Sequence, residues 1–161
     1  MPRSLRDSIR QARPFDTPGQ EAALSILRTA AELAASLDQV FKPFGVTATQ
    51  YNALRILRGA GPAGLCRHEV IDRMVTRMPD VTRLLDRLEE AGLVSRARDD
   101  ADRRLVNTRL TEAGAAMLER LDPLVAEEHR RRMAGLSEPE LRQVIELLAK
   151  LRDGQPTGDT A

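Results

Sequence analysis

Apolar residues between Pro79 and Gly92 follow a helical spacing. They fall at i, i+3, i+4 and i+7 on one side of a helix, and they are Val81, Leu84, Leu85 and Leu88. Pro79 suits the first helical turn, and Gly92 suits a position just past the last turn. The pattern therefore predicts a short helix. Its polar side has Thr82 on the flank and, opposite the apolar stripe, Arg83, Asp86, Arg87 and Glu90.

The segment after this helix changes to two short strand-like runs, residues 93–98 and 105–110. The residues between them, 99–104, are too polar for anything but an exposed tip. Thr111 then has the residue type of a helix N-cap. The expected structure is a two-stranded hairpin with a charged tip, followed by another helix.

Three more helices are predicted before this region. They are residues 20–41, ended by Pro43 and Gly45, residues 47–58, and residues 66–74. Thr47 and Gln50 form a capping box at the start of the second. The short third helix and the helix after Pro79 together predict a helix-turn-helix.

Two long helices are expected at the C-terminal end. The first runs from Thr111 to about Met133 with Pro123 as a kink or local break, and the second begins after Ser137 and ends at Arg152. The flanking helices have more apolar surface than a winged module alone can cover. We therefore expect them to pack on each other and on a second copy of the chain.

The predicted fold is mainly α with a small two-stranded β wing. We expect a single domain over residues 1–153, with a winged helix-turn-helix at about residues 46–111 and dimerisation helices at about 20–42 and 112–152. Residues 154–161 are polar and contain Gly and Pro, which predicts a disordered tail.

The composition limits the class of protein but does not identify its function. With 42% hydrophobic and 30% charged residues the chain is typical of globular proteins, and its net charge of +1 is not that of a polycation. Any binding to nucleic acid must depend on how charge is arranged, because affinity requires local neutralisation of phosphates. The single cysteine excludes an intramolecular disulfide, and no apolar run approaches a membrane span, so we expect a cytoplasmic protein.

The sequence lacks the motifs of an enzyme. We find no Ser/His/Asp set and no glycine-rich phosphate loop. His68, His129 and Cys66 match no metal-ligand spacing, so neither a metal nor a cofactor is predicted. Cys66 permits a redox role, but a small, partly buried residue is the favoured interpretation.

A helix with arginines on its polar face, followed by a hairpin with arginines at its tip, has a clear physical use. The helix can enter a DNA major groove while the hairpin reaches the adjacent minor groove. The linear pattern closely resembles the MarR family of winged-helix transcription regulators over about residues 46–118. The matching motifs are Val46-Thr-x-x-Gln50-Tyr-x-x-Leu54, Gly61-Pro62, Val81-Thr-Arg-Leu-Leu-Asp-Arg-Leu-Glu89, Gly92-Leu-Val94, Arg98-Asp99, Asp102-Arg-Arg104 and Leu110-Thr-x-x-Gly114.

The resemblance implies a mode of action. It implies a homodimer on a palindromic operator of double-stranded DNA, acting as a repressor and released by a small-molecule effector. In the wing motif it implies that Arg104, with Arg103 beside it, enters the minor groove while Asp102 orients it. The resemblance also implies an effector pocket between the dimer helices and the winged module. Four residues are candidates for its lining, although each is equally plausible as an ordinary core or surface residue: Arg28, Phe41, Phe44 and Tyr51.

Several residues keep two interpretations. Thr82, Arg83 and Arg87 are candidates for contacts with bases or phosphates, yet the arginines also have Asp86 and Glu90 at helical spacing. Arg77 is a further DNA-binding candidate where the family commonly has small residues. Asp80 either contacts a cytosine or, as we favour, stabilises the helix N-terminus. The near-neutral charge and Asp80 leave one alternative function, a winged-helix module that binds proteins and not DNA.

Overall fold

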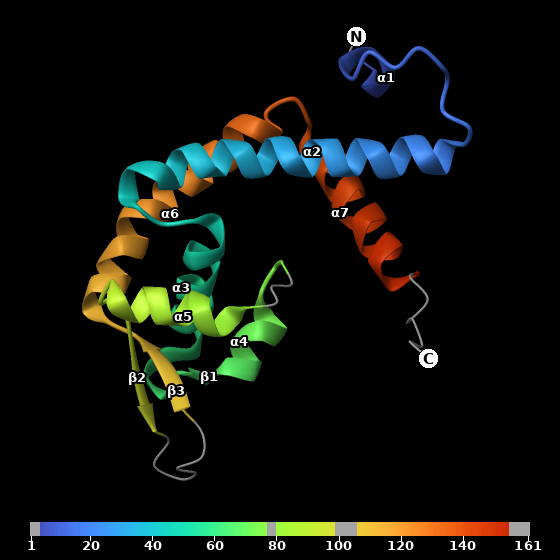
Figure 1. Cartoon of the computed structure of the whole chain (residues 1–161). Helices are drawn as coiled ribbons and strands as arrows, with labels where there is room; N and C mark the ends of the chain where they lie inside the picture. Colours follow the sequence, from blue (N-terminus) through green and yellow to red (C-terminus); the bar gives the residue numbers. More distant parts are fainter. Residues whose placement is uncertain (1–3, 77–79, 99–105, 155–161) are drawn as a thin grey trace, which may run out of the picture. The chain divides into compact units, whose positions relative to one another are not determined.

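The computed structural model describes residues 4–76, 80–98 and 106–154. The chain divides into two compact units, residues 1–125 and 126–161, and α6 begins in the first and ends in the second. The elements of the first unit (Figure 1) are α1 Leu5–Ser8, α2 Pro18–Phe41, η1 Lys42–Phe44, α3 Ala48–Ala60, η2 Gly61–Ala63, β1 Leu65–Cys66, α4 Arg67–Arg73, α5 Val81–Glu90, β2 Val94–Arg98 and β3 Val106–Leu110. The two remaining helices are α6 Glu112–Met133 and α7 Glu138–Asp153.

The first two predicted helices are confirmed, with small shifts at their ends. α2 starts two residues earlier than expected because Thr17 caps it, accepting a hydrogen bond from the Gln20 amide at 3.1 Å. The capping box of α3 is present: the Gln50 amide donates to Thr47 Oγ1 at 3.2 Å, and the Thr47 amide donates to Gln50 Oε1 at 2.9 Å. Between the two helices Gly45 has a φ of 68°, which explains the sharp stop.

The apolar stripe of α5 is buried as predicted. Its four residues have exposed fractions of 7% or less, and they share one core with residues of α3 and α6 such as Leu54, Leu57, Leu118 and Leu121. The helix begins at Val81, and Pro79, predicted for its first turn, lies outside the described residues. At the other end Gly92 has a φ of 71°, and the Leu93 amide donates to the Leu88 carbonyl at 2.9 Å.

The sheet has one more strand than the sequence pattern predicts. The two wing strands are confirmed as the antiparallel pair β2–β3, and β1 pairs with the other edge of β3, in the order β1-β3-β2. Cys66, expected in the short helix, lies in β1, and α4 begins one residue later. A two-residue strand is too short to produce a recognisable alternation.

Gly64 shows how closely β1 and β3 approach. It has a φ of 72°, and a Cβ atom at this position would lie 2.5 Å from the Thr108 carbonyl oxygen. Thr108 is itself only 2% exposed. A glycine is therefore required where η2 leads into the sheet.

α6 starts where the sequence indicates. Thr111 Oγ1 accepts a hydrogen bond from the Gly114 amide at 3.1 Å and donates to the Gly92 carbonyl at 2.7 Å, so one side chain caps α6 and fixes the end of α5. Gly114 is in close contact with the wing, since a Cβ there would lie 2.2 Å from the Leu93 carbonyl oxygen. Of the two alternatives predicted at Pro123, a kink or a local break, the break is wrong, because α6 is one helix from Glu112 to Met133 with Pro123 inside it.

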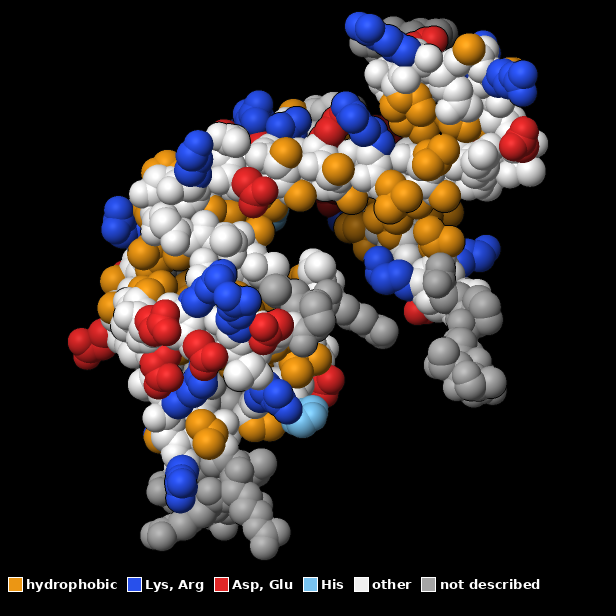
Figure 2. Space-filling view, viewed as in Figure 1, with side chains coloured by type: hydrophobic (Ala, Val, Ile, Leu, Met, Phe, Trp, Pro, Cys, Tyr) orange, Lys and Arg blue, Asp and Glu red, His pale blue; other side chains and the backbone are white. Residues whose placement is uncertain are grey.

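Two of the flanking helices expose apolar side chains, as Figure 2 shows along α2 and along α7. On α2 these include Leu24, Ile26 and Leu27, and on α7 they include Val144, Ile145, Leu147 and Leu151. α7 has the predicted capping box, in which the Ser137 amide donates to Glu140 Oε2 at 2.7 Å. Within the described ranges, no helix is both long and apolar enough to cross a membrane.

Candidate nucleic-acid interface

The polar face of α5 presents arginines to solvent. Thr82, Arg83 and Arg87 are all exposed, opposite the buried stripe. Neither arginine forms an ion pair within the part of the chain that the structure describes. The interpretation in which they pair with Asp86 and Glu90 therefore has no support in this structure. Figure 2 shows Lys and Arg side chains gathered beside Asp and Glu side chains over this module, a mixed surface in keeping with the net charge of +1.

Asp86 has a different partner. Arg96 of β2 donates from Nη2 to Asp86 Oδ1 at 2.6 Å, and its Nε lies 3.5 Å from Glu89 Oε2. The Arg96 amide also donates to Glu89 Oε1 at 3.1 Å. With a side chain only 22% exposed, Arg96 fastens the first wing strand to α5. Arg96 is not among the residues predicted from the sequence, because no spacing within one element indicates a contact between a helix and the following strand.

Asp80 has the structural role that we favoured. Its Oδ1 accepts a hydrogen bond from the Arg83 amide at 2.9 Å, which makes Asp80 the N-cap of α5. A carboxylate at this position also interacts favourably with the positive end of the helix dipole. The cap therefore fixes the start of the helix beside Thr82 and Arg83.

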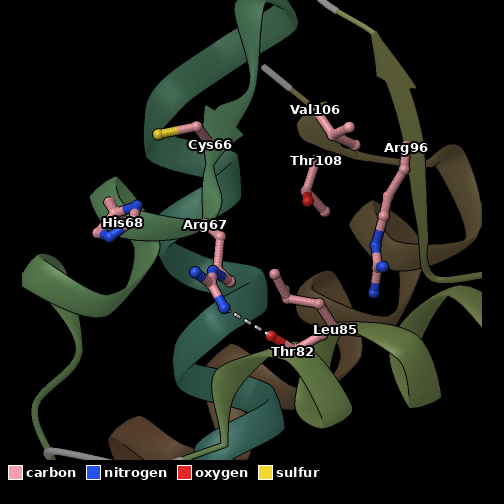
Figure 3. Close-up of a pocket in the computed structure, with 8 residues that line it drawn as sticks. All are labelled: Cys66, Arg67, His68, Thr82, Leu85, Arg96, Val106 and Thr108. Atoms are coloured by element: carbon pink, nitrogen blue, oxygen red, sulfur yellow. Dashed lines mark hydrogen bonds between the residues drawn. The ribbon is translucent and has the colours of Figure 1, made fainter. Parts of the chain in front are cut away.

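A groove of about 490 Å³ lies between α4, α5 and the sheet (Figure 3). Arg67 of α4 donates from Nη1 to Thr82 Oγ1 at 3.1 Å across it. Its lining is Cys66, Arg67, His68, Thr82, Leu85, Arg96, Val106 and Thr108. Arg67 is exposed and is not among the residues predicted from the sequence, while Cys66 is half-buried as expected.

A second groove, of about 500 Å³, lies on the other flank of α5. Arg83 and Arg87 line it together with residues from the start of α3, among them Thr47, Thr49 and Gln50. The positive end of the α3 dipole thus adds to the two guanidinium groups. The arrangement is suited to an anionic ligand that follows the surface, such as a phosphate backbone.

The predicted minor-groove residues fall outside the described part of the chain. Asp102, Arg103 and Arg104 of the wing tip, and Arg77 before α5, lie there. The structure describes the strands on either side of the tip, with Arg98 paired to Val106 as the last register pair of the hairpin. The roles of these four residues stay predictions.

The suggested effector-lining residues do not gather in one cavity of the described structure. Phe41 and Tyr51 are core residues with exposed fractions of 1% and 7%, and their ring centroids are 5.0 Å apart. Arg28 is exposed on α2 and pairs with Glu32 at 2.6 Å. The described residues contain no group of three or more His, Cys, Asp or Glu side chains placed to bind a metal ion.

Tyr51 and Asp122 form a polar contact between α3 and α6. The Tyr51 hydroxyl donates to Asp122 Oδ1 at 2.7 Å, and Arg58 Nη1 donates to Asp122 Oδ2 at 2.6 Å. Burial, the hydrogen bond to Asp122 and the Asp122 charge together raise the pKa of Tyr51 to about 12. Partial burial acts to raise the pKa of Asp122, but the hydrogen bonds from Tyr51 and Arg58 outweigh it, and the net shift is downward.

The fold and this surface define a winged helix-turn-helix protein with an exposed arginine face on the second helix of the motif. The MarR family model matches residues 46–106. The regulator PecS of Dickeya dadantii (strain 3937) is 31% identical over 117 residues, which cover 72% of this chain and 70% of PecS. The chain belongs to the MarR family of transcription regulators.

Solved structures agree with this assignment. A MarR transcription factor from Planctomyces limnophilus is 39% identical, with a TM-score of 0.65 over 84% of this chain and 98% of that one. BpsR of Bordetella bronchiseptica is 26% identical, with a TM-score of 0.77 over 89% of this chain and all of that chain (100%). BpsR is a protein whose DNA binding is regulated by 6-hydroxynicotinic acid.

Proposed function

We propose that the chain is a repressor that binds a palindromic operator in double-stranded DNA as a homodimer and leaves it when a small molecule binds. The observation that supports this most directly is the pair of exposed arginines on α5, Arg83 and Arg87, which have no ion-pair partner among the described residues. Exposed cations on the second helix of a helix-turn-helix are what DNA recognition requires.

In this proposal α5 lies in the major groove. Thr82, Arg83 and Arg87 contact bases or phosphates, and Arg77 contacts the DNA beside the start of the helix. An arginine that binds guanine with two hydrogen bonds contributes about 1–3 kcal/mol of discrimination against other bases. The groove shared by Arg83, Arg87 and the start of α3 supports a phosphate contact on the same flank.

The wing extends the contact to the neighbouring minor groove. Arg104 is inserted there with Arg103 beside it, and Asp102 orients the guanidinium. Arginine is favoured in a narrow minor groove because the negative potential is enhanced there. The Arg96 bridge to Asp86 and Glu89 supports the proposal, because it links the position of the hairpin to that of α5.

The apolar faces of α2 and α7 are the proposed dimer surface. The proposed single domain covers residues 1–153; the tail predicted at 154–161 lies, after Gly154, outside the described residues. Two-fold symmetry presents two copies of α5 to half-sites about one helical turn of DNA apart, and this is why the operator is a palindrome. Release follows if an effector binds better to a dimer whose reading helices do not match that spacing. The regulation of BpsR by a small molecule supports this last step.

The test is a selection of bound fragments from genomic DNA. The wild type is compared with Arg83→Ala and Arg104→Ala, and with Arg130→Ala as a control, since Arg130 is 77% exposed and pairs with Glu127 on its own helix. We expect the wild type and the control to enrich one palindrome and the other two variants to lose it. Equal enrichment by all four proteins would contradict the assigned interface.

The alternative is a protein-binding module without DNA affinity, which the net charge of +1 favours. Salt dependence separates the two functions. DNA binding through phosphates gives log K a slope of about −0.9 per contacted phosphate against log salt concentration. If the wild type enriches no sequence and shows no such slope with mixed duplex DNA, the protein-binding alternative replaces the proposal.

A further inference from the structure

Three of the four aromatic residues of the chain gather where the end of α2, α3 and the first half of α6 meet. The chain has three Phe, one Tyr and no Trp, and Phe41, Phe44 and Tyr51 lie at this junction. The Phe41 and Tyr51 rings are 5.0 Å apart. Arg120 of α6 lies over the Phe44 ring at 5.0 Å. Tyr51 thus contacts α2 through its ring and α6 through its hydroxyl.

Asp122 receives hydrogen bonds on both carboxylate oxygens, and both donors come from α3. Tyr51 donates to Oδ1 and Arg58 donates to Oδ2, at 2.7 Å and 2.6 Å. We call these three residues the α3–α6 clamp. Asp122 lies 71 positions after Tyr51 and 64 positions after Arg58, so the clamp connects two elements that are distant in the sequence.

The clamp adds direction to a contact that is otherwise apolar. Leu54 and Leu57 of α3 share a fully buried core with Leu118 and Leu121 of α6. Burial of apolar surface is non-directional, whereas a hydrogen bond requires a particular distance and angle. Because Arg58 and Asp122 are 41% and 34% exposed, their ion pair contributes little to stability. Its main physical effect is to fix how α6 lies on α3.

The position of the clamp within α6 is also informative. Pro123 follows Asp122 inside the helix, and a proline lacks the amide that would donate to the carbonyl four residues earlier. The boundary between the two compact units falls after Val125. The clamp therefore holds α6 on α3 at the residue before Pro123, within the first compact unit.

We propose that Tyr51, Arg58 and Asp122 are positioning residues for DNA binding, which set the preferred spacing between the two operator half-sites. The inference rests on the proposed function, in which α6 connects the winged module to the dimer helices. In this proposal the contact between α3 and the first half of α6 restricts how each winged module tilts, and so restricts the distance between the two copies of α5. Without the clamp each winged module tilts more freely, and the dimer accepts half-sites at several spacings.

The test uses duplexes that contain the selected palindrome at its own spacing and at spacings one base pair shorter and longer. Dissociation constants are measured by fluorescence anisotropy at one salt concentration. The proteins are the wild type, Tyr51→Phe, Asp122→Asn and the control Glu127→Gln, whose carboxylate on α6 forms an ion pair with Arg130 and makes no contact with the clamp in the described structure. Circular dichroism melting is recorded for each.

We expect the wild type and Glu127→Gln to prefer the original spacing by about tenfold or more, a typical size for energetic coupling between sites. In Tyr51→Phe and Asp122→Asn the preference falls to about threefold or less, and the melting temperature falls moderately because a hydrogen bond to a carboxylate is lost. A purely structural contact would also lower the melting temperature, but it would leave the spacing preference unchanged.

Each other outcome is decisive. If both variants fold and keep the wild-type spacing preference, the inference is wrong and the proposed function stands. If Asp122→Asn does not fold, Tyr51→Phe, which removes one oxygen atom, decides the question. If neither variant folds, the clamp is a stability element and the inference is wrong. If the wild type selects no DNA, the proposed function fails first and the inference fails with it.

Discussion

At the scale of single residues, Arg96 shows how a long cationic side chain connects two elements. It reaches from β2 to two carboxylates spaced three residues apart on α5. Its stem is largely buried while Asp86 and Glu89 remain 46% and 43% exposed. The pairing therefore determines position more than it determines stability, because solvent screens the partly exposed carboxylates.

Replacing Arg96 with Met tests this. The substitution keeps the apolar stem and removes both ion pairs, so we expect a loss of about 1 kcal/mol in the free energy of unfolding by urea. DNA affinity should fall by a larger factor, because the wing is no longer fastened to α5. Arg98→Met, exposed on the same strand and without an ion pair among the described residues, is the control. A loss of stability with unchanged affinity would contradict the positioning role.

Tyr51 gives a second residue-scale prediction, this time in alkaline solution. Its pKa is about 12 in the folded chain against an ordinary value of 10.0. The folded state thus keeps a proton that the unfolded state loses, and stability is complete below pH 10 and decreases as the pH rises towards about 12. Tyr51→Phe should lack this part of the decrease.

The measurement is the midpoint of urea unfolding between pH 8 and pH 11 for both proteins. Tyr51 is the only tyrosine of the chain, so any difference between the two pH profiles comes from this one phenol group. Lysines also titrate in this range, but they are common to both proteins. Identical pH profiles would show that burial and Asp122 do not raise the pKa of Tyr51 in the folded protein.

At the scale of elements, the two helical glycines of α3 and α6 differ in their surroundings. Gly59 has no neighbour within 4 Å of a Cβ position, whereas a Cβ on Gly114 would lie 2.2 Å from the Leu93 carbonyl oxygen. Helix propensity alone would make alanine favourable at both positions. At Gly114 the nearby Leu93 carbonyl leaves no room for a Cβ atom, so alanine is unfavourable there despite its higher helix propensity.

We therefore expect opposite results from one substitution. Gly59→Ala should stabilise the fold by about 0.5 kcal/mol, because it reduces the conformational freedom of the unfolded chain. Gly114→Ala should destabilise it by about 1–3 kcal/mol, because Leu93 or α6 must shift to make room. Urea unfolding of both variants tests the pair. A stable Gly114→Ala protein would mean that the hairpin does not approach α6 as closely as the structure has it.

These elements also show what the sequence can predict. The stripe from Val81 to Leu88, the capping box of Thr47 and the cap at Thr111 were predicted because each depends on residues a few positions apart. β1, the Arg67–Thr82 hydrogen bond and the Tyr51–Asp122 contact were not predicted. Each of these joins segments that meet only after folding, and periodicity within one element contains no information about such contacts.

The residues of the candidate site also fall into those that the sequence predicts and those that it does not. The sequence predicted the exposed face of α5 from its spacing, and it predicted Asp80 as the favourable residue at the helix start. It could not predict that Asp86 pairs with Arg96 and leaves Arg83 and Arg87 without that partner, because the choice depends on the position of β2. Arg77 and the wing-tip residues lie outside the described ranges, so their roles depend on the family pattern alone.

At the scale of the whole molecule, the exposed apolar residues of α7 are hard to explain for a monomer. Ile145 and Leu147 are 64% and 57% exposed, and Val144 and Leu151 are also exposed on the same helix. Contiguous apolar surface of this kind indicates a binding face for another protein surface. In the proposed function that surface belongs to the second copy of the chain.

Ile145→Glu tests the dimer and its relation to DNA. A carboxylate buried in an apolar interface has no partner, so we expect the variant to sediment as a monomer at concentrations where the wild type is a dimer. Operator affinity should then fall by about a hundredfold or more, because each monomer binds one half-site without the gain in effective concentration. Arg142→Ala, exposed on the same helix, should change neither property. A variant that stays dimeric would place the interface elsewhere, whereas a monomer with wild-type operator affinity would show that one winged module is sufficient for recognition.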